Sequence, residues 1–451
     1  MTKALLSEGD SNQSPRRAKW QKKNVSKKTA ALLERDSKVF LHQTLSTPCL
    51  SALKNVDGSY ITDLDNRKYL DFHGNNVHQA GFSHPDIIHA VKKQLDELSF
   101  CTRRFTNEKA VELAEKLIKI SPAGLDRVLF APGGTSAIGM AVKLARVYTG
   151  RHKTISMWDS FHGASLDAVS LGGEATFRKG IGPLMSGTEH VPPAGSYRCF
   201  FDCDEKHKKL KCADYIEYIL EKEQDVCAVI AETVRSTPYF PPSGYWKKVK
   251  RACEKYGALL ILDEIPTCLG RTGSMFACER YGVVPDMLVI GKGLGGGVFP
   301  LAALLANEKF NEAAKHHALG HYTHEKNPVA AAAALALIDV IEKEKLTANV
   351  LDMGRFAVER LKASQELYPF IGDVRGMGLL IGVELVKSRG TKEPDTDTAE
   401  EIMYRALEKG LSFKVTIGNI LTLTPPLSIS KPEMERALDI LEECFSEVSH
   451  G

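Results

Sequence analysis

Short apolar runs alternate with amphipathic segments along the middle of the chain. The runs cover residues 128–130, 154–157, 226–231, 259–262, 287–290 and 301–305. Strands that alternate with helices in this way favour a mostly parallel α/β sheet with helices on both faces. Ligands of such sheets bind beyond the carboxyl ends of the strands. The polar residues that follow these runs are therefore the first candidates for chemistry.

The pattern changes on both sides of this region. Residues 1–28 are polar and basic, and we expect a flexible arm. Residues 29–75, with a turn at Asp57-Gly58, should pack with the small domain. A large domain is expected over 76–328. A linking helix and a smaller α+β domain, with a strand near 379–385 and helices near 398–409 and 431–446, should occupy 329–451.

Composition narrows the class of protein. The chain has 451 residues, is 43% hydrophobic and 25% charged, and carries a net charge of +3 without a basic stripe. This is ordinary globular usage and argues against a nucleic-acid partner. No stretch approaches the ~20 apolar residues of a membrane span. The N-terminus lacks the apolar core of a signal peptide, and the 10 cysteines form no C-x-x-C pair. We therefore expect a cytoplasmic protein with reduced thiols.

Two charged residues stand at the ends of buried runs. Asp263 directly follows 259–262, and Lys292 follows 287–290 after one glycine. A buried carboxylate needs a cationic partner, and a protonated pyridine nitrogen is one. A lysine amine in such a place can form an imine with an aldehyde cofactor. The same positions also fit a helix cap at Asp263 and an ion-paired or anion-binding Lys292.

Three further features follow runs of the same sheet. Gly133-Gly134-Thr135-Ser136 opens a helix, where backbone amides and the helix dipole favour a phosphate. Phe161 could stack on a planar cofactor, and Glu232 is another polar group at a strand end. A capped tight turn and core packing of Phe161 are the competing interpretations. The order of phosphate loop, aromatic residue, aspartate and lysine along the chain is a more specific indication of a cofactor site than any one of these features.

With these residues the chain resembles the class III, omega-type aminotransferases of pyridoxal-phosphate (PLP) fold type I, from about residue 45 to 446. The resemblance rests on Leu262-Asp263-Glu264-Ile265 with Gly270-Arg271-Thr272-Gly273, and on Gly291-Lys292-Gly293 before Pro300-Leu301. It implies a large domain with a mostly parallel, seven-stranded type of sheet flanked by helices, and a smaller α+β domain.

The resemblance also implies roles for single residues. Gly134 and Thr135 should bind the phosphate of PLP, and Phe161 should stack on its ring. Asp263 should hold the pyridine nitrogen, and Lys292 should form the Schiff base. Thr323 matches a threonine that reaches the phosphate in the neighbouring subunit, which implies a homodimer with shared active sites.

The departures from the family pattern bear on the reaction. A glutamine that usually follows the Asp-Glu-Ile motif is Pro266 here, and the acidic residue of the phosphate loop is Ser136. The arginine that clamps the carboxylate of 2-oxoglutarate corresponds to Thr422, and its gating glutamate to Thr237. Threonine cannot make the bidentate contact of arginine. An elimination on one substrate is therefore favoured over transamination.

The segments 72–79 and 321–328 resemble a family branch linked to phosphonate breakdown, which deaminates 1-hydroxy-2-aminoethylphosphonate to phosphonoacetaldehyde. We therefore expect an ammonia-lyase with a small amine substrate. Alternatives are an omega-aminotransferase that uses pyruvate, a phospho-lyase on phosphoethanolamine-like amines, an aminomutase or decarboxylase, and a non-catalytic scaffold. No standard zinc spacing joins the four histidines of 316–324, so no metal is expected. The candidate substrate contacts are Asn76, His78, Arg103, Arg104, Arg235 and Thr422.

Overall fold

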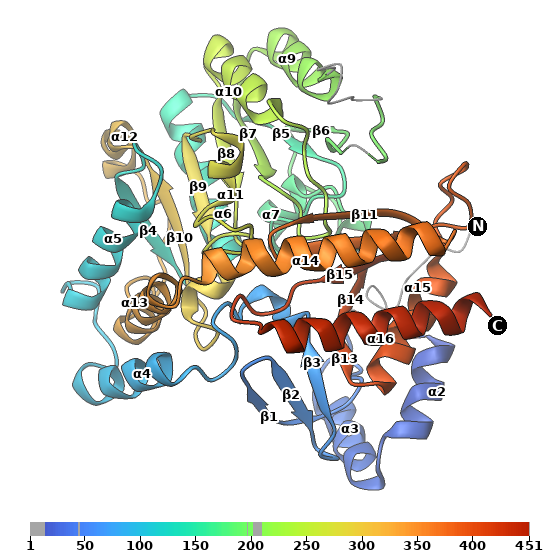
Figure 1. Cartoon of the computed structure of the whole chain (residues 1–451). Helices are drawn as coiled ribbons and strands as arrows, with labels where there is room; N and C mark the ends of the chain where they lie inside the picture. Colours follow the sequence, from blue (N-terminus) through green and yellow to red (C-terminus); the bar gives the residue numbers. More distant parts are fainter. Residues whose placement is uncertain (1–13, 44–45, 196, 202–209, 451) are drawn as a thin grey trace. The chain divides into compact units, whose positions relative to one another are not determined.

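The computed structural model describes residues 14–43, 46–195, 197–201 and 210–450, which fall into two compact units (Figure 1). The larger unit is Pro85–Thr347. The smaller unit combines Met1–His84 with Ala348–Gly451. None of the described helices is long and apolar enough to cross a membrane.

A seven-stranded sheet forms the centre of the larger unit. Strand β10 runs antiparallel to both of its neighbours, and the other neighbouring strands are parallel. This confirms the predicted fold class, and every predicted apolar run is a strand. In sheet order the strands are β4 (Arg127–Ala131), β10 (Ala302–Ala306), β9 (Met287–Ile290), β8 (Leu259–Asp263), β7 (Val226–Glu232), β5 (Lys153–Met157) and β6 (Thr188–Val191).

Helices pack around this sheet, and α6 lies in its core: eight residues of α6 are buried. The helices are α4 (Pro85–Glu97), α5 (Glu108–Ile120), α6 (Gly134–Thr149), α7 (Leu166–Leu171), α8 (Ala175–Arg178), α9 (Lys211–Glu223), α10 (Tyr245–Tyr256), α11 (Ala277–Tyr281), α12 (Asn311–Lys315) and α13 (Pro328–Lys343), with short 3₁₀ turns η2 (Lys292–Gly295) and η3 (Glu308–Phe310). Helix α13 packs on α4 and α5. It therefore groups with the larger unit, whereas the sequence analysis placed it after that domain, as a linking helix at the start of 329–451.

Two four-stranded sheets organise the smaller unit. The first is β1 (Leu53–Asp57), β2 (Tyr60–Asp63), β3 (Lys68–Asp71) and β13 (Leu411–Ser412); the second is β11 (Ile371–Met377), β12 (Leu380–Leu385), β15 (Ile420–Leu423) and β14 (Lys414–Thr416). Because β3 pairs with β13, the first sheet joins segments from both ends of the chain. The helices are α2 (Pro15–Asn24), α3 (Lys27–Val39), α14 (Leu346–Leu367), α15 (Thr396–Glu408) and α16 (Lys431–Ser449), with the turn η1 (Gly74–Asn76).

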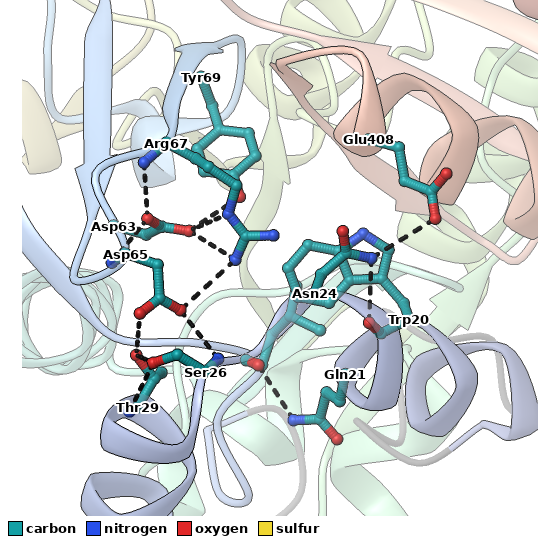
Figure 2. A network of polar contacts seen from close by, with 11 residues as sticks. Trp20, Gln21, Asn24, Ser26, Thr29, Asp63, Asp65, Arg67, Tyr69 and Glu408 are labelled. Atoms are coloured by element: carbon teal, nitrogen blue, oxygen red, sulfur yellow. Dashed lines mark hydrogen bonds and ion pairs between the residues drawn. The ribbon is translucent and has the colours of Figure 1, made fainter.

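Helix α2 corrects part of the prediction of a flexible arm over 1–28. Ser14 caps the helix, and Trp20 is buried with the Arg67 guanidinium 5.4 Å from its ring centroid. Figure 2 shows Arg67 between Trp20 and Asp63. Lys23 pairs with Glu408 of α15 at 2.8 Å. The buried Trp20 indole and a few ion pairs thus hold α2 in place. The polar sequence of this helix gave no indication that it packs against other parts of the protein. Residues 1–13 of the predicted arm lie outside the described part of the chain.

Replacing Trp20 by alanine should therefore destabilise the smaller unit. The expected loss is about 3 kcal/mol of unfolding free energy, because a large buried side chain leaves a cavity. Urea denaturation followed by circular dichroism measures it. Trp20→Phe keeps most of the buried surface and should lose less than half as much. Equal losses in both variants would argue against this packing role.

Candidate active site

A buried aspartate–histidine pair lies where two strands end. Asp263 is the last residue of β8 and is 1% exposed. Its Oδ1 accepts a hydrogen bond from the Ile265 N–H at 3.0 Å, and its Oδ2 lies 2.8 Å from Nδ1 of His162. A carboxylate only accepts hydrogen bonds, so Nδ1 carries the hydrogen. The pair is a buried, hydrogen-bonded polar group at the carboxyl edge of the sheet.

Lys292 follows the neighbouring strand β9. Asp263 pairs with Val289 across the two parallel strands, which puts Lys292 three residues beyond that pairing. Lys292 has a φ of +46° and opens the turn η2. A non-glycine residue in this left-handed region is uncommon and is concentrated at functional sites. The half-buried lysine and the aspartate thus belong to adjacent strand ends.

The loop before α6 approaches the segment after β8. A Cβ atom on Gly134 would lie 2.6 Å from Cδ1 of Ile265, so a larger residue here would have to displace the end of the isoleucine side chain. The N-cap residue Gly133 provides no side-chain cap, so the first backbone N–H groups of the helix remain available to a ligand. Thr135 Oγ1 lies 3.0 Å from Ser165 Oγ. This is a suitable cradle for an anion such as a phosphate.

Two further predicted cofactor contacts lie at the same edge. The half-buried ring of Phe161 packs against Phe177, with centroids 4.3 Å apart at 40°. Glu232 ends β7 directly beside Asp263 and pairs with Arg235 at 3.1 Å. Burial raises the pKa of Glu232, and the Arg235 charge opposes that shift. All the predicted cofactor residues except Thr323 therefore lie at the ends of β4, β5, β7, β8 and β9 or in the loops that follow them. Thr323 is exposed and lies in the loop before α13.

The predicted substrate contacts in the larger unit differ in their surroundings. Arg103 and Arg104 are exposed, and Arg103 contacts His321. Arg235 is only 7% exposed and is already paired with Glu232. The exposed pair is thus open to a ligand, whereas Arg235 is part of the buried polar structure.

The remaining predicted contacts belong to the smaller unit. Asn76 has a φ of +58°. His78 is buried, with Nε2 3.2 Å from the Asp71 carbonyl oxygen and its ring stacked on a neighbouring phenylalanine. Thr422 is buried in β15, with its Oγ1 2.7 Å from that of Thr416. All three are held by their own unit, and their roles toward a substrate stay predictions.

Sequence reasoning missed several polar residues around the aspartate. His162 stands next to Phe161 in the motif but was not assigned a role. Glu264 is fully buried; it accepts hydrogen bonds from Thr233 Oγ1 at 2.8 Å and from two backbone N–H groups of α11. Burial raises the pKa of Glu264 to about 7. The sequence offered one signal for His162. This histidine follows the end of β5, and Asp263 ends β8, another strand of the same sheet.

The histidines of 316–324 have partners of their own. His316 Nε2 lies 3.2 Å from Glu312 Oε1, and His317 Nδ1 lies 3.0 Å from the Ala313 carbonyl oxygen. Over the residues that the structure describes, no group of three or more histidine, cysteine or acidic side chains could hold a metal ion.

Comparisons with known proteins agree with this geometry. The model of the aminotransferase class-III family matches residues 42–445. The chain is 51% identical to an (R)-1-hydroxy-2-aminoethylphosphonate ammonia-lyase of Vibrio splendidus (strain 12B01), covering 98% of this chain and 95% of that one. It is 35% identical to a leucine/methionine racemase of Thermococcus litoralis, covering 93% and 96%. A PLP-bound amine transaminase from an uncultivated Pseudomonas species superposes with a TM-score of 0.86 at 31% identity, covering 91% and 99%. The chain belongs to the class-III aminotransferase family, a family of PLP-dependent enzymes.

Proposed function

We propose that this protein is a PLP-dependent ammonia-lyase that converts 1-hydroxy-2-aminoethylphosphonate to phosphonoacetaldehyde and ammonia. The observation that carries the proposal is the 51% identity, over 98% of the chain, to a protein named for that activity. The replacement of the carboxylate-clamping arginine by Thr422 supports elimination over transamination.

The residues at the sheet edge fit PLP. Asp263 is a buried carboxylate, and such a group is stable in the interior when donors and a cation surround it. Gly133 caps α6 without a side-chain hydrogen bond, which leaves the first backbone N–H groups of the helix as donors for a phosphate. Lys292 would hold the aldehyde carbon, and Phe161 would cover one face of the ring. When bound, PLP supplies an electron-accepting ring that stabilises a carbanion next to the substrate amine.

The protein's own side chains then move protons and fix geometry. Lys292 would take the proton from the carbon that bears the amine. Asp263, oriented by His162, would hold the pyridine nitrogen in its protonated form. The hydroxyl group would leave the neighbouring carbon with a proton, as water, and that carbon would then gain a proton in its place. Water would finally replace the nitrogen at the carbon that bore the amine, so the products are the aldehyde and ammonia.

The phosphonate needs cationic or amide donors. Arg103 and Arg104 are the exposed cations among the candidates, and Asn76, His78 and Thr422 are candidates from the smaller unit. Arg235 is neutralised by Glu232, so we assign it a lesser part in substrate binding. We expect the substrate to be bound as an anion.

The test is ammonia release without any keto acid. The purified holoenzyme should release ammonia and aldehyde from the hydroxy-aminophosphonate in equal amounts over many turnovers. The matched control is 2-aminoethylphosphonate, which lacks the hydroxyl group and should yield no sustained ammonia. Release that stops at one equivalent, or that requires pyruvate, would instead identify an aminotransferase. Phosphate release from phosphoethanolamine would identify a phospho-lyase.

We also propose a cytoplasmic homodimer with shared active sites. The family pattern at Thr323 supports the dimer, and so does a groove of about 480 Å³ beside the edge strand β4, which is lined by apolar residues such as Val111, Leu129 and Met140. Both Val111 and Leu129 are exposed in a single chain. None of the nine described cysteines forms a disulfide, which is consistent with a reducing compartment.

A further inference from the structure

Two buried serines continue the polar chain behind the aspartate. Ser156 lies in β5 and Ser160 in the loop after it, and neither is more than 1% exposed. Ser156 Oγ lies 3.4 Å from Nε2 of His162 and 3.4 Å from Ser160 Oγ. The polar contacts thus run from Asp263 through His162 and Ser156 to Ser160.

Each of the two serine hydroxyl groups in this series of polar contacts has only one hydrogen to donate. Ser160 Oγ is 2.7 Å from the Met157 carbonyl oxygen, so its hydrogen is donated there. The Ser160 oxygen also accepts a bond from the Gly173 N–H at 3.3 Å. Ser156 therefore has one hydrogen for two neighbours, Ser160 and His162. If it donates to Ser160, Nε2 of His162 can bond to Ser156 only as a protonated nitrogen.

The other side of Ser160 meets a small cavity of about 20 Å³, which Glu232 and Arg235 also line. Roughly 10–15 Å³ suffices for one water molecule if polar partners are present. Over the described residues, the buried Nη1 of Arg235 has no hydrogen-bond partner. Glu232 is a second polar partner, and it is bonded to the Nε of the same arginine.

We propose that Ser156 is a positioning residue that keeps His162 in the neutral form with its hydrogen on Nδ1. A water molecule in the cavity accepts from Arg235 and donates to Ser160 and Glu232. Both lone pairs of the Ser160 oxygen are then engaged, by this water and by Gly173. The Ser156 hydrogen consequently turns to Nε2 of His162.

The arrangement matters for Asp263. An imidazolium at His162 would neutralise the carboxylate, and less of its charge would face the pyridine nitrogen. A neutral His162 orients the carboxylate by one hydrogen bond and leaves its charge available. This consequence rests on the proposed function, in which Asp263 partners the cofactor nitrogen. The hydrogen-bond relay itself concerns only residues of the chain.

Nitrogen NMR of ¹⁵N-histidine-labelled protein tests the relay without activity. His162 resonances are assigned by their loss in His162→Gln. In the wild-type protein, with and without PLP, His162 should show one protonated and one hydrogen-bonded unprotonated nitrogen. Ser156→Ala should shift the Nε2 resonance, and Ser156→Cys, which keeps a weak donor, should shift it less. Ser170→Ala is the matched control, because Ser170 is also buried but bonds to Leu166 and Met185.

Kinetics add a second measurement. Ser156→Ala should lower kcat roughly tenfold, the effect of one lost hydrogen bond, with KM unchanged. Two protonated nitrogens on His162 in the wild-type protein would overturn the proposal, and so would an unmoved Nε2 in Ser156→Ala. The wild-type spectrum decides even where the variant does not fold. Because the spectra are also recorded without PLP, a failure of the ammonia-lyase assay leaves this test intact.

Discussion

Lys292→Ala is expected to lower the rate of ammonia release by about 10⁴-fold. Two losses combine in this variant. The covalent link that holds PLP is removed, and so is the amine that takes the substrate proton. The position at the end of β9, one strand from Asp263, gives this lysine access to the edge where the predicted phosphate loop also lies.

The measurement combines ammonia release with borohydride reduction and mass spectrometry. Wild-type protein should carry a reduced PLP adduct on the peptide that contains Lys292, and Lys292→Ala should carry none at the active site. Lys309→Ala is the matched control, since Lys309 belongs to the same unit but pairs with Asp286. An adduct that persists in Lys292→Ala would mean that another lysine holds the cofactor.

The larger unit was predictable because its central strands are buried on both faces. A strand such as β7, in which all seven residues are buried, must be continuously apolar, and this pattern is visible in sequence. Strand β6 was missed because it lies at the sheet edge and reads Thr-Glu-His-Val, with only its last residue buried. Short, partly exposed edge strands carry little hydrophobic signal.

Helix α2 was missed for a related reason. Its sequence is basic, and local polarity indicates a solvated segment. The helix is held by long-range contacts, such as Arg17 Nη2 to the Pro48 carbonyl oxygen at 2.8 Å and Lys23 to Glu408. These partners lie 31 and 385 residues away along the chain, so local patterns cannot indicate them.

The cofactor residues were predicted from their order along the chain, but their partners were not. Arg235 is an example: as a cation near a strand end it suggested a substrate contact, yet in the structure it is buried against Glu232. Glu232, three residues earlier, is visible in the sequence as an acidic neighbour of Arg235. Whether the two side chains form a buried ion pair depends on how the loop after β7 packs. The contact between His162 and Asp263 likewise joins β5 to β8, two strands that are not neighbours in the sheet.

Asp263→Asn should lower kcat by about 10²–10³-fold while leaving KM nearly unchanged. The amide has the shape of the carboxylate, so packing and the hydrogen bonds from His162 and Ile265 can persist. What disappears is the negative charge, which stabilises the cofactor most when a carbanion forms. An interaction made mainly in the transition state changes kcat rather than KM.

Asp286→Asn is the matched control for this charge. Asp286 is also buried in the larger unit, where its Oδ2 accepts from the Leu260 N–H at 2.9 Å and from Lys250 at 2.7 Å. Its loss should reduce stability in urea while kcat falls by less than about threefold, because its partners are structural. A rise in KM with unchanged kcat in Asp263→Asn would contradict the assignment. The carboxylate would then contribute only to substrate binding. The rate enhancement of the reaction would have to come from Lys292 and the loops around it.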